Sequence, residues 1–142
     1  MVGALLAISI IFGLVIVSTV VVMIWLGRRL RLLASGRQGD SICRFARSLD
    51  YRRLDTKVIR AVYEGLQECL QFAHPAFPVR PSDDLERDYL MDAEELEEMV
   101  CEIADRLGRS LQGYEKNPHY PKIRTVSGLI EFLCAQPKVS TS

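Results

Sequence analysis

The chain has 142 residues, enough for one domain, with 18 basic and 18 acidic residues and a formal net charge of zero. The balance hides an asymmetry, because residues 28–60 carry ten basic and three acidic residues and the rest of the chain carries eight and fifteen. Four cysteines without a CxxC spacing give no reason to expect a metal site or a disulfide. The basic residues lack the aromatic-lined pattern of a nucleic-acid-binding domain, so we expect no nucleic-acid partner and regard lipid as the simpler target.

An apolar segment comes first in the chain. From Ala4 to Leu26 the sequence ALLAISIIFGLVIVSTVVVMIWL contains no charged residue. As a helix it would extend roughly 35 Å at about 1.5 Å per residue, enough for a hydrocarbon core of about 30 Å. Many of its residues are β-branched, but in lipid a helix satisfies its own backbone hydrogen bonds and a lone strand does not. We therefore predict a transmembrane anchor over residues 1–27.

The charges beside this segment predict its type and its orientation. A cleaved signal peptide has its positive charge before the apolar run, whereas Arg28, Arg29 and Arg31 follow it. Cytoplasmic flanks carry the excess of basic residues, so we expect a single-pass protein of the inner membrane with its N-terminus outside. The remainder of the chain is then cytoplasmic. Trp25 lies where an aromatic side chain would meet the interface.

Residues 28–53 are predicted to form a basic juxtamembrane linker that contains a short amphipathic helix. Ile42, Phe45, Ala46 and Leu49 recur at helical spacing after the polar stretch SGRQGD of residues 35–40. This helix either lies on the membrane surface or extends the next helix and packs on the domain, and the pattern favours neither. The candidates for contact with anionic headgroups are Arg28, Arg29, Arg31, Arg44 and Arg47.

The next predicted helix begins at Asp55 or Thr56, either of which can cap it, and ends near Gln71. Its apolar stripe consists of Val58, Val62, Leu66, Cys69 and Leu70. Three prolines between residues 75 and 81 then exclude a regular helix. The result is a loop of about twenty residues, and a loop of that length in a compact domain is either functional or a sign that the element assignment is wrong.

The clearest helix begins at Asp92, where Glu95 completes a pattern like a capping box, and Gly108 is placed to end it. Its apolar face comprises Leu96, Met99, Val100, Ile103 and Leu107. A last helix, VSGLIEFLCA, follows the capping residue Thr125, and residues 136–142 are expected to be a flexible tail. Three of the cysteines fall in helical patterns beside apolar neighbours, where we expect them to pack in the core. Residues 54–135 are therefore predicted to form an all-α bundle.

Several short motifs in residues 54–135 resemble, in order and spacing, those of the acyl carrier protein family. Residues 84–90, DLERDYL, resemble the family's Asp-Leu-x-x-Asp-Ser-Leu, and residues 95–96 lie where its second helix has Glu-Leu. Residues 123–126, IRTV, and residues 132–133, FL, resemble the beginning and the end of its last helix. The resemblance implies three main helices, with a long loop between the first two and a broken segment before the last.

In that family the serine of the first motif carries phosphopantetheine, whose thiol holds acyl groups. In this chain Tyr89 stands in the serine's position when the motif is aligned from the loop side, and Leu90 does so when it is aligned from the helix side. The nearest serines, Ser82 and Ser110, lie outside the junction of loop and helix. We therefore expect no phosphopantetheine and no other cofactor. We expect Tyr89 to cover the end of the bundle as a half-buried aromatic.

The resemblance also implies a binding surface, because carrier proteins present an acidic second helix to basic patches on their partner enzymes. The corresponding carboxylates are Glu94, Glu95, Glu97, Glu98 and Glu102. The alternative explanation is that these carboxylates form a solvated helix face without a partner. A charged surface of this kind steers and selects partners more than it fixes affinity.

These observations predict a membrane-anchored, non-catalytic, carrier-like protein-interaction module on the cytoplasmic face. His74 and His119 have no Ser or Cys partner in a recognisable nucleophile motif, so we expect no enzyme. Two alternatives stay open. One is an acyl carrier with an atypical attachment site, and the other is an unrelated small helical membrane adaptor.

Overall fold

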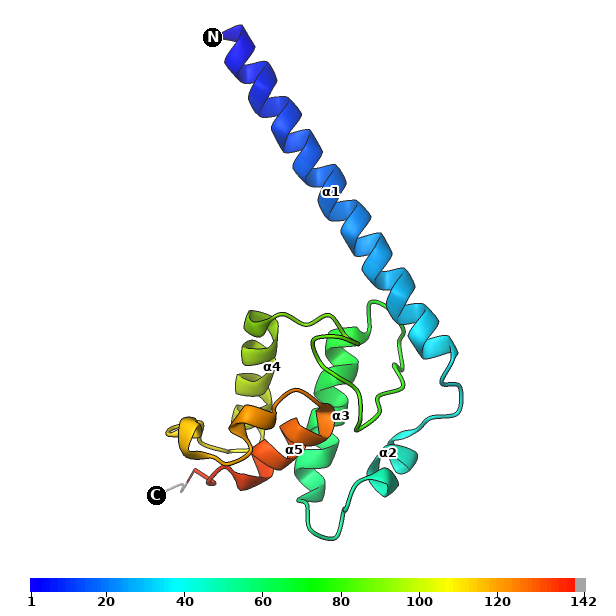
Figure 1. Ribbon diagram of the computed structural model, residues 1–142, viewed down its shortest axis with the longest axis vertical. Helices are drawn as coiled ribbons and strands as arrows, with labels where there is room; N and C mark the ends of the chain where they lie inside the picture. Colours follow the sequence, from blue (N-terminus) through cyan, green and yellow to red (C-terminus); the bar gives the residue numbers. More distant parts are fainter. Residues whose placement is uncertain (140–142) are drawn as a thin grey trace.

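The computed structural model describes residues 1–139, which form an all-α protein in which a long apolar helix is followed by a small helical bundle (Figure 1). The elements are α1 (Val2–Ser35), α2 (Ile42–Ser48), α3 (Thr56–Leu70), α4 (Ala93–Arg106) and α5 (Val126–Ala135). Two 3-10 turns, η1 (Tyr114–Lys116) and η2 (Tyr120–Lys122), connect α4 to α5. The predicted all-α class is confirmed, and α3 packs against both α4 and α5.

Helix α1 is long and apolar enough to cross a membrane, and none of its most apolar stretch is buried in the protein. The prediction that a linker begins at residue 28 was wrong, because the helix continues through the arginines to Ser35. Leu30 and Ala34 are only 0% and 4% exposed, and Leu33 is half-buried beside them. These three residues recur at helical spacing and pack against the bundle, which keeps the last turns of α1 helical.

Helix α2 is a separate short helix that packs on α3. Phe45 and Leu49 are buried, and the ring of Phe45 lies 5.0 Å from that of Tyr63. The apolar face of α2 is therefore covered by the bundle. The packing alternative is favoured over a helix lying on the membrane, although α2 does not continue into α3.

The helices of the bundle begin where the sequence predicts. The side chains of Asp55 and Thr125 accept hydrogen bonds from backbone N–H groups at the start of α3 and α5, and Asp92 forms a complete capping box with Glu95 at the start of α4. Helices α3 and α4 approach closely at Gly65, where an added Cβ would lie 2.9 Å from Ile103 Cδ1. Capping side chains set where these helices begin, and the absence of a side chain at Gly65 allows α3 and α4 to approach closely.

The end of the chain is held more firmly than expected. Ser110 N donates to Pro137 O at 2.9 Å, and Val139 N donates to Gly108 O at 2.8 Å. The side chain of Arg109 donates to the carbonyl oxygens of Cys134 and Gln136. The predicted flexible tail was wrong for residues 136–139, because these backbone contacts with residues 108–110 follow from the fold. Residues 140–142 lie outside the described part of the chain.

The prediction that three cysteines pack in the core was wrong for Cys69 and Cys101, whereas Cys134 packs partly buried against the core. Cys69 and Cys101 are exposed, as is Cys43, and Cys134 is half-buried. Cys69 and Cys101 each lie next to a buried residue in sequence, Leu70 and Val100, but at the side of the buried helix face. Cys69 belonged to the predicted apolar stripe, and the buried face of α3 is narrower than that stripe, whereas Cys101 lies outside the apolar face predicted for α4.

Candidate functional site

The segment of residues 84–91 is folded tightly by its own aspartates. Asp84 Oδ1 accepts a hydrogen bond from Arg87 N, and Asp88 Oδ2 accepts one from Asp84 N. Leu85 N donates to Arg124 O, which ties the segment to the start of α5. Leu90 follows with a φ of 59°, a left-handed conformation that costs a residue with a Cβ on the order of 1–3 kcal/mol. Buried residues on either side, Tyr89 and Met91, hold it there.

Tyr89 lies at the centre of a buried polar cluster. Its hydroxyl donates to Asp83 Oδ2 at 2.5 Å, and its ring meets Phe77 edge-on with centroids 5.6 Å apart. Arg37 donates to both oxygens of Asp83, at 2.6 and 2.7 Å. Arg80 N adds a further hydrogen bond to Asp83 at 2.8 Å. We call the side chains of Arg37, Asp83 and Tyr89 the Asp83 cluster.

Tyr89 was predicted to be half-buried, but it is only 2% exposed. The reason is that a carboxylate inside the domain satisfies its hydroxyl, so the whole side chain can leave water. Burial, followed by the adjacent negative charge of Asp83, raises the pKa of the phenol far above its usual range. The hydroxyl is therefore neutral, bonded and shielded from any modifying enzyme. In the other register, Leu90 has no hydroxyl to offer.

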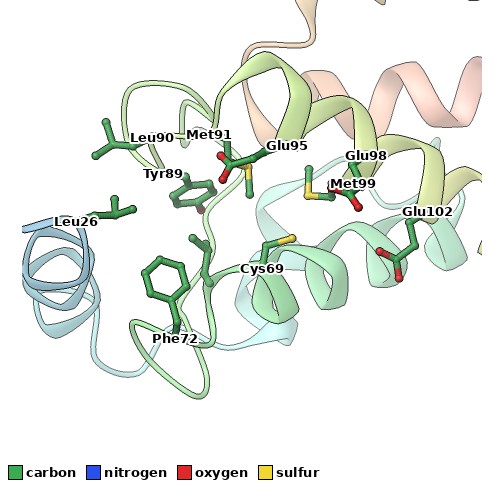
Figure 2. A pocket seen from close by; sticks show the side chains of 11 residues that line it. Leu26, Cys69, Phe72, Tyr89, Leu90, Met91, Glu95, Glu98, Met99 and Glu102 are labelled. Atoms are coloured by element: carbon green, nitrogen blue, oxygen red, sulfur yellow. The ribbon is translucent and has the colours of Figure 1, made fainter. Parts of the chain in front are cut away.

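A groove of about 240 Å³ opens beside Tyr89, between α1, the end of α3 and the first turns of α4 (Figure 2). Leu26, Phe72 and Leu90 lie at the end near α1, and Glu98 and Glu102 project from α4 (Figure 2). Met91 and Met99 are among the residues that line the groove between them. The groove therefore has an apolar end and an acidic side.

Cys69 also lines this groove. Partial desolvation, followed by the negative charges of Glu102, Glu68 and other glutamates, raises the pKa of its thiol. The thiol is therefore protonated at neutral pH and is a poor nucleophile. The groove is suited to contact and recognition rather than to covalent chemistry.

The five predicted carboxylates of α4 are all exposed, but they are not equivalent. Glu95 accepts from Asp92 N in the capping box, and Glu102 pairs with Arg106 at 3.0 Å. Among the side chains that the structure describes, which do not include those of Val2 and Lys122, Glu94, Glu97 and Glu98 have no ion-pair partner. We call these three residues the acidic face of α4. It is the part of the predicted surface for which the described side chains supply no counter-charge.

The five predicted membrane-surface arginines divide between two helices. Arg28, Arg29 and Arg31 are exposed on α1 just after the apolar stretch. The guanidinium carbon of Arg29 lies 5.5 Å from the ring centroid of Trp25, and Arg29 Nη2 donates to Arg87 O at 3.2 Å. The other two, Arg44 and Arg47, are exposed on α2, and Arg44 pairs with Asp40. The structure therefore does not bring the five together.

A second hollow, of about 590 Å³, lies between α4 and the 3-10 turns. Its lining is largely apolar and includes Leu96, Val100, Tyr114, Tyr120 and Phe132. The rings of Tyr114 and Tyr120 lie 4.8 Å apart at its edge. Glu97 of the acidic face also lines it, so α4 separates two grooves of different character.

The sequence patterns do not reveal two important parts of this site. Arg37 lies in a glycine-flanked stretch that was predicted to be a linker, yet it is the main charged partner of Asp83. Phe72 is 54% exposed at the mouth of the groove, and it was not singled out. An isolated arginine between glycines and an unpaired Asp-Asp doublet are the signals from which the ion pair could have been predicted.

In comparisons with known proteins, no family model, no curated protein and no solved structure matches this chain. The resemblance to acyl carrier proteins therefore depends on the short motifs of residues 84–96, 123–126 and 132–133. Function follows from the chemistry of the chain's own residues.

Proposed function

We propose that this chain is a single-pass membrane protein whose bundle is a non-catalytic, carrier-like module that binds a protein partner. The observation that carries the proposal is a contrast within one segment. The hydroxyl of Tyr89, at the position of the family's attachment serine, is buried and bonded to Asp83. The acidic face of α4, a few residues later, is exposed. The hydroxyl that would have to carry a prosthetic group is buried, and the acidic face that would contact a partner is exposed.

Helix α1 supports the anchor. It is long enough to cross a membrane, and in water its apolar stretch would expose large hydrophobic side chains along its whole length. Arg28, Arg29 and Arg31 follow that stretch, which by the positive-inside rule directs the bundle to the cytoplasm and the N-terminus to the outside. The proposed location is the cytoplasmic face of the inner membrane.

The acidic face and its groove define the chemistry of the partner. Uncompensated carboxylates attract a basic patch and repel acidic surfaces, so they act chiefly on partner choice and association rate. Beside Glu98 the groove offers an apolar lining in which an aliphatic or aromatic side chain would lose its contact with water. We therefore propose a protein partner that presents Lys or Arg around one apolar anchor side chain.

Crosslinked capture from membranes tests this proposal through the charge-reversal variant Glu94→Lys/Glu98→Lys. Recovery of the partner should fall by more than about tenfold, because like charges placed against a basic patch cost several kcal/mol. The matched control is Asp50→Lys/Glu64→Lys, which reverses two exposed carboxylates outside α4 and should recover the partner like the wild type. If both variants recovered the partner equally well, the acidic face would be a solvated surface without a binding role, and the proposal would be wrong.

The second candidate function is an acyl carrier with an atypical attachment site. The apolar hollow between α4 and the 3-10 turns favours it, because a space of that size and lining has room for a hydrocarbon chain. Against it stand the buried hydroxyl of Tyr89 and the lack of any hydroxyl at Leu90. The third candidate, an unrelated helical adaptor, would use the same acidic face and differs only in ancestry.

A further inference from the structure

The surroundings of α1 change at Leu26. Residues 3–25 are exposed, whereas Leu26 is half-buried, and Leu30 and Ala34 are buried against the bundle. The apolar run also ends at Leu26, because Arg28 follows it. The bundle therefore meets α1 at the level where the hydrocarbon core would end.

The bundle is fixed to α1 by three kinds of contact. Leu30 and Ala34 are buried in the shared core. Beyond the end of the helix, Arg37 is bound through two hydrogen bonds to Asp83, and closer to the apolar run Arg29 donates to the carbonyl oxygen of Arg87. Because these contacts lie along several turns of α1 and the residues just after it, the bundle cannot swing freely about the anchor. The depth of α1 in a bilayer then sets the depth of the bundle.

The surface that this arrangement brings to the boundary is apolar. Phe72 is 54% exposed and lies near Leu26 at the mouth of the groove, with Leu90 on the other side (Figure 2). Between Glu68 and Asp83 the chain contains no carboxylate. A large exposed aromatic side chain in a stretch without acidic residues, beside the end of a candidate membrane span, is typical of an interfacial contact.

We propose that Leu26, Phe72 and Leu90, which we call the membrane apex, form a lipid-binding surface of the bundle that lies in the interfacial layer of the bilayer. The inference rests on the proposed anchor, and it adds a second membrane contact that belongs to the folded bundle. Its consequence is a fixed orientation, because one end of the groove faces lipid and the acidic side runs away from the anchor along α4.

The charges around the membrane apex permit contact with anionic lipid. Arg28 and Arg31 are exposed on the turn that follows Leu26, where they can meet phosphate groups. The nearest hollow on the loop side is lined by Arg29, Arg87 and Arg124 together with the acidic residues Glu86 and Asp92. The three basic side chains in that hollow offset its two carboxylates.

Fluorescence quenching in full-chain proteoliposomes tests the proposal, since the chain contains one tryptophan. The vesicles contain phosphatidylglycerol and phosphatidylcholine brominated near the headgroup. Wild-type protein reports on Trp25, and the variant Trp25→Phe/Phe72→Trp reports on the membrane apex. We expect the reporter at position 72 to lose a fraction of its emission close to that lost by Trp25. Its emission maximum should lie at a shorter wavelength than that of free tryptophan in water.

The control variant is Trp25→Phe/Tyr51→Trp. Tyr51 is 46% exposed and precedes α3, whereas Phe72 follows it, so about 22 Å of helix separates them at about 1.5 Å per residue. This reporter should keep its emission in brominated vesicles. If Trp25 is quenched and the reporter at position 72 is not, the lipid contact of the membrane apex is overturned and the anchor stands. If neither is quenched, the anchor and with it the proposed function are overturned. Equal quenching of the reporters at positions 51 and 72 overturns the assigned orientation of the bundle.

Discussion

Two sets of carboxylates lie a few residues apart in this chain and do different work. Asp83, Asp84 and Asp88 lie in the loop before α4, and each is bound by an arginine side chain. The acidic face of α4 is exposed, and none of its three glutamates has an ion-pair partner among the side chains that the structure describes. The loop carboxylates stabilise the fold, and we propose that the helix carboxylates meet a partner.

The difference is one of internal partners, which the loop carboxylates have and the three glutamates of the acidic face lack among the described side chains. In the loop, Asp83 and Tyr89 form a buried hydrogen bond, and Asp83 also binds Arg37 just beyond the end of α1. These contacts couple the loop to α1. On α4, Glu95 and Glu102 have internal partners, whereas Glu94, Glu97 and Glu98 have none among the described side chains, which is why we propose a role in recognition for these three.

The largest expected effect is that of Asp83→Ala. It leaves the guanidinium of Arg37 buried without its counter-ion and Tyr89 without its acceptor, so the free energy of unfolding should fall by about 3–5 kcal/mol. Urea denaturation of the full chain in detergent micelles, followed by circular dichroism, measures it. Asp50→Ala removes an exposed pair with Arg53 and should change little. If Asp83→Ala lowered the free energy of unfolding no more than Asp50→Ala, the Asp83 cluster would not stabilise the fold as described.

A smaller loss is expected for Tyr89→Phe. The ring keeps its contact with Phe77, and Asp83 keeps Arg37, so only a hydrogen bond to a charged acceptor is removed. Such a bond is worth about 1.5–3 kcal/mol. The same denaturation experiment measures it. Stability equal to that of the wild type would indicate that the hydroxyl is solvated, as an accessible attachment site would require.

The loop carboxylates should also make stability depend on pH. The Arg87 backbone N–H, followed by the Arg124 guanidinium, lowers the pKa of Asp84, and the Arg87 side chain lowers that of Asp88. Because both titrate at lower pH in the folded chain, their contribution is present above the unfolded value of about 3.9 and is lost as pH falls below it. Unfolding free energies measured down the pH scale should show a shallower decline in Arg124→Leu. An unchanged slope in that variant would argue against the Arg124–Asp84 pair.

The smallest effect on stability is expected on α4. Glu94→Lys/Glu98→Lys places positive charge near the N-terminus of a helix, which costs less than about 1 kcal/mol per residue on an exposed surface. Melting of this variant should therefore stay close to that of the wild type while partner capture is lost. A large loss of stability would mean that these glutamates support the fold, and the contrast between the two sets would fail.

The sequence predicts the helices well because their signals are local. Asp55, Asp92 and Thr125 cap the helices they were expected to cap, and Gly108 follows the end of α4 with a φ of 60°. These features depend on neighbours within one helical turn, so a linear pattern contains them.

The features that the sequence did not predict depend on contacts between segments far apart in the chain. Arg37 meets Asp83 across 46 positions, and the backbone of residues 108–110 holds residues 137–139. No spacing rule records such pairs, which is why the linker and the tail were predicted to be loose. The burial of Tyr89 was underestimated for the same reason, since its acceptor and the arginine behind it come from the tertiary fold.

The measurement that tests the central claim most directly is the intact mass of the full chain after co-expression with a phosphopantetheinyl transferase. An established acyl carrier protein expressed in the same cells is the control and must gain its arm. Because the hydroxyl of Tyr89 is buried against Asp83, the account predicts the mass of the unmodified chain. A gain of one phosphopantetheine arm, mapped to the peptide of residues 83–96, would contradict it and make this protein a carrier.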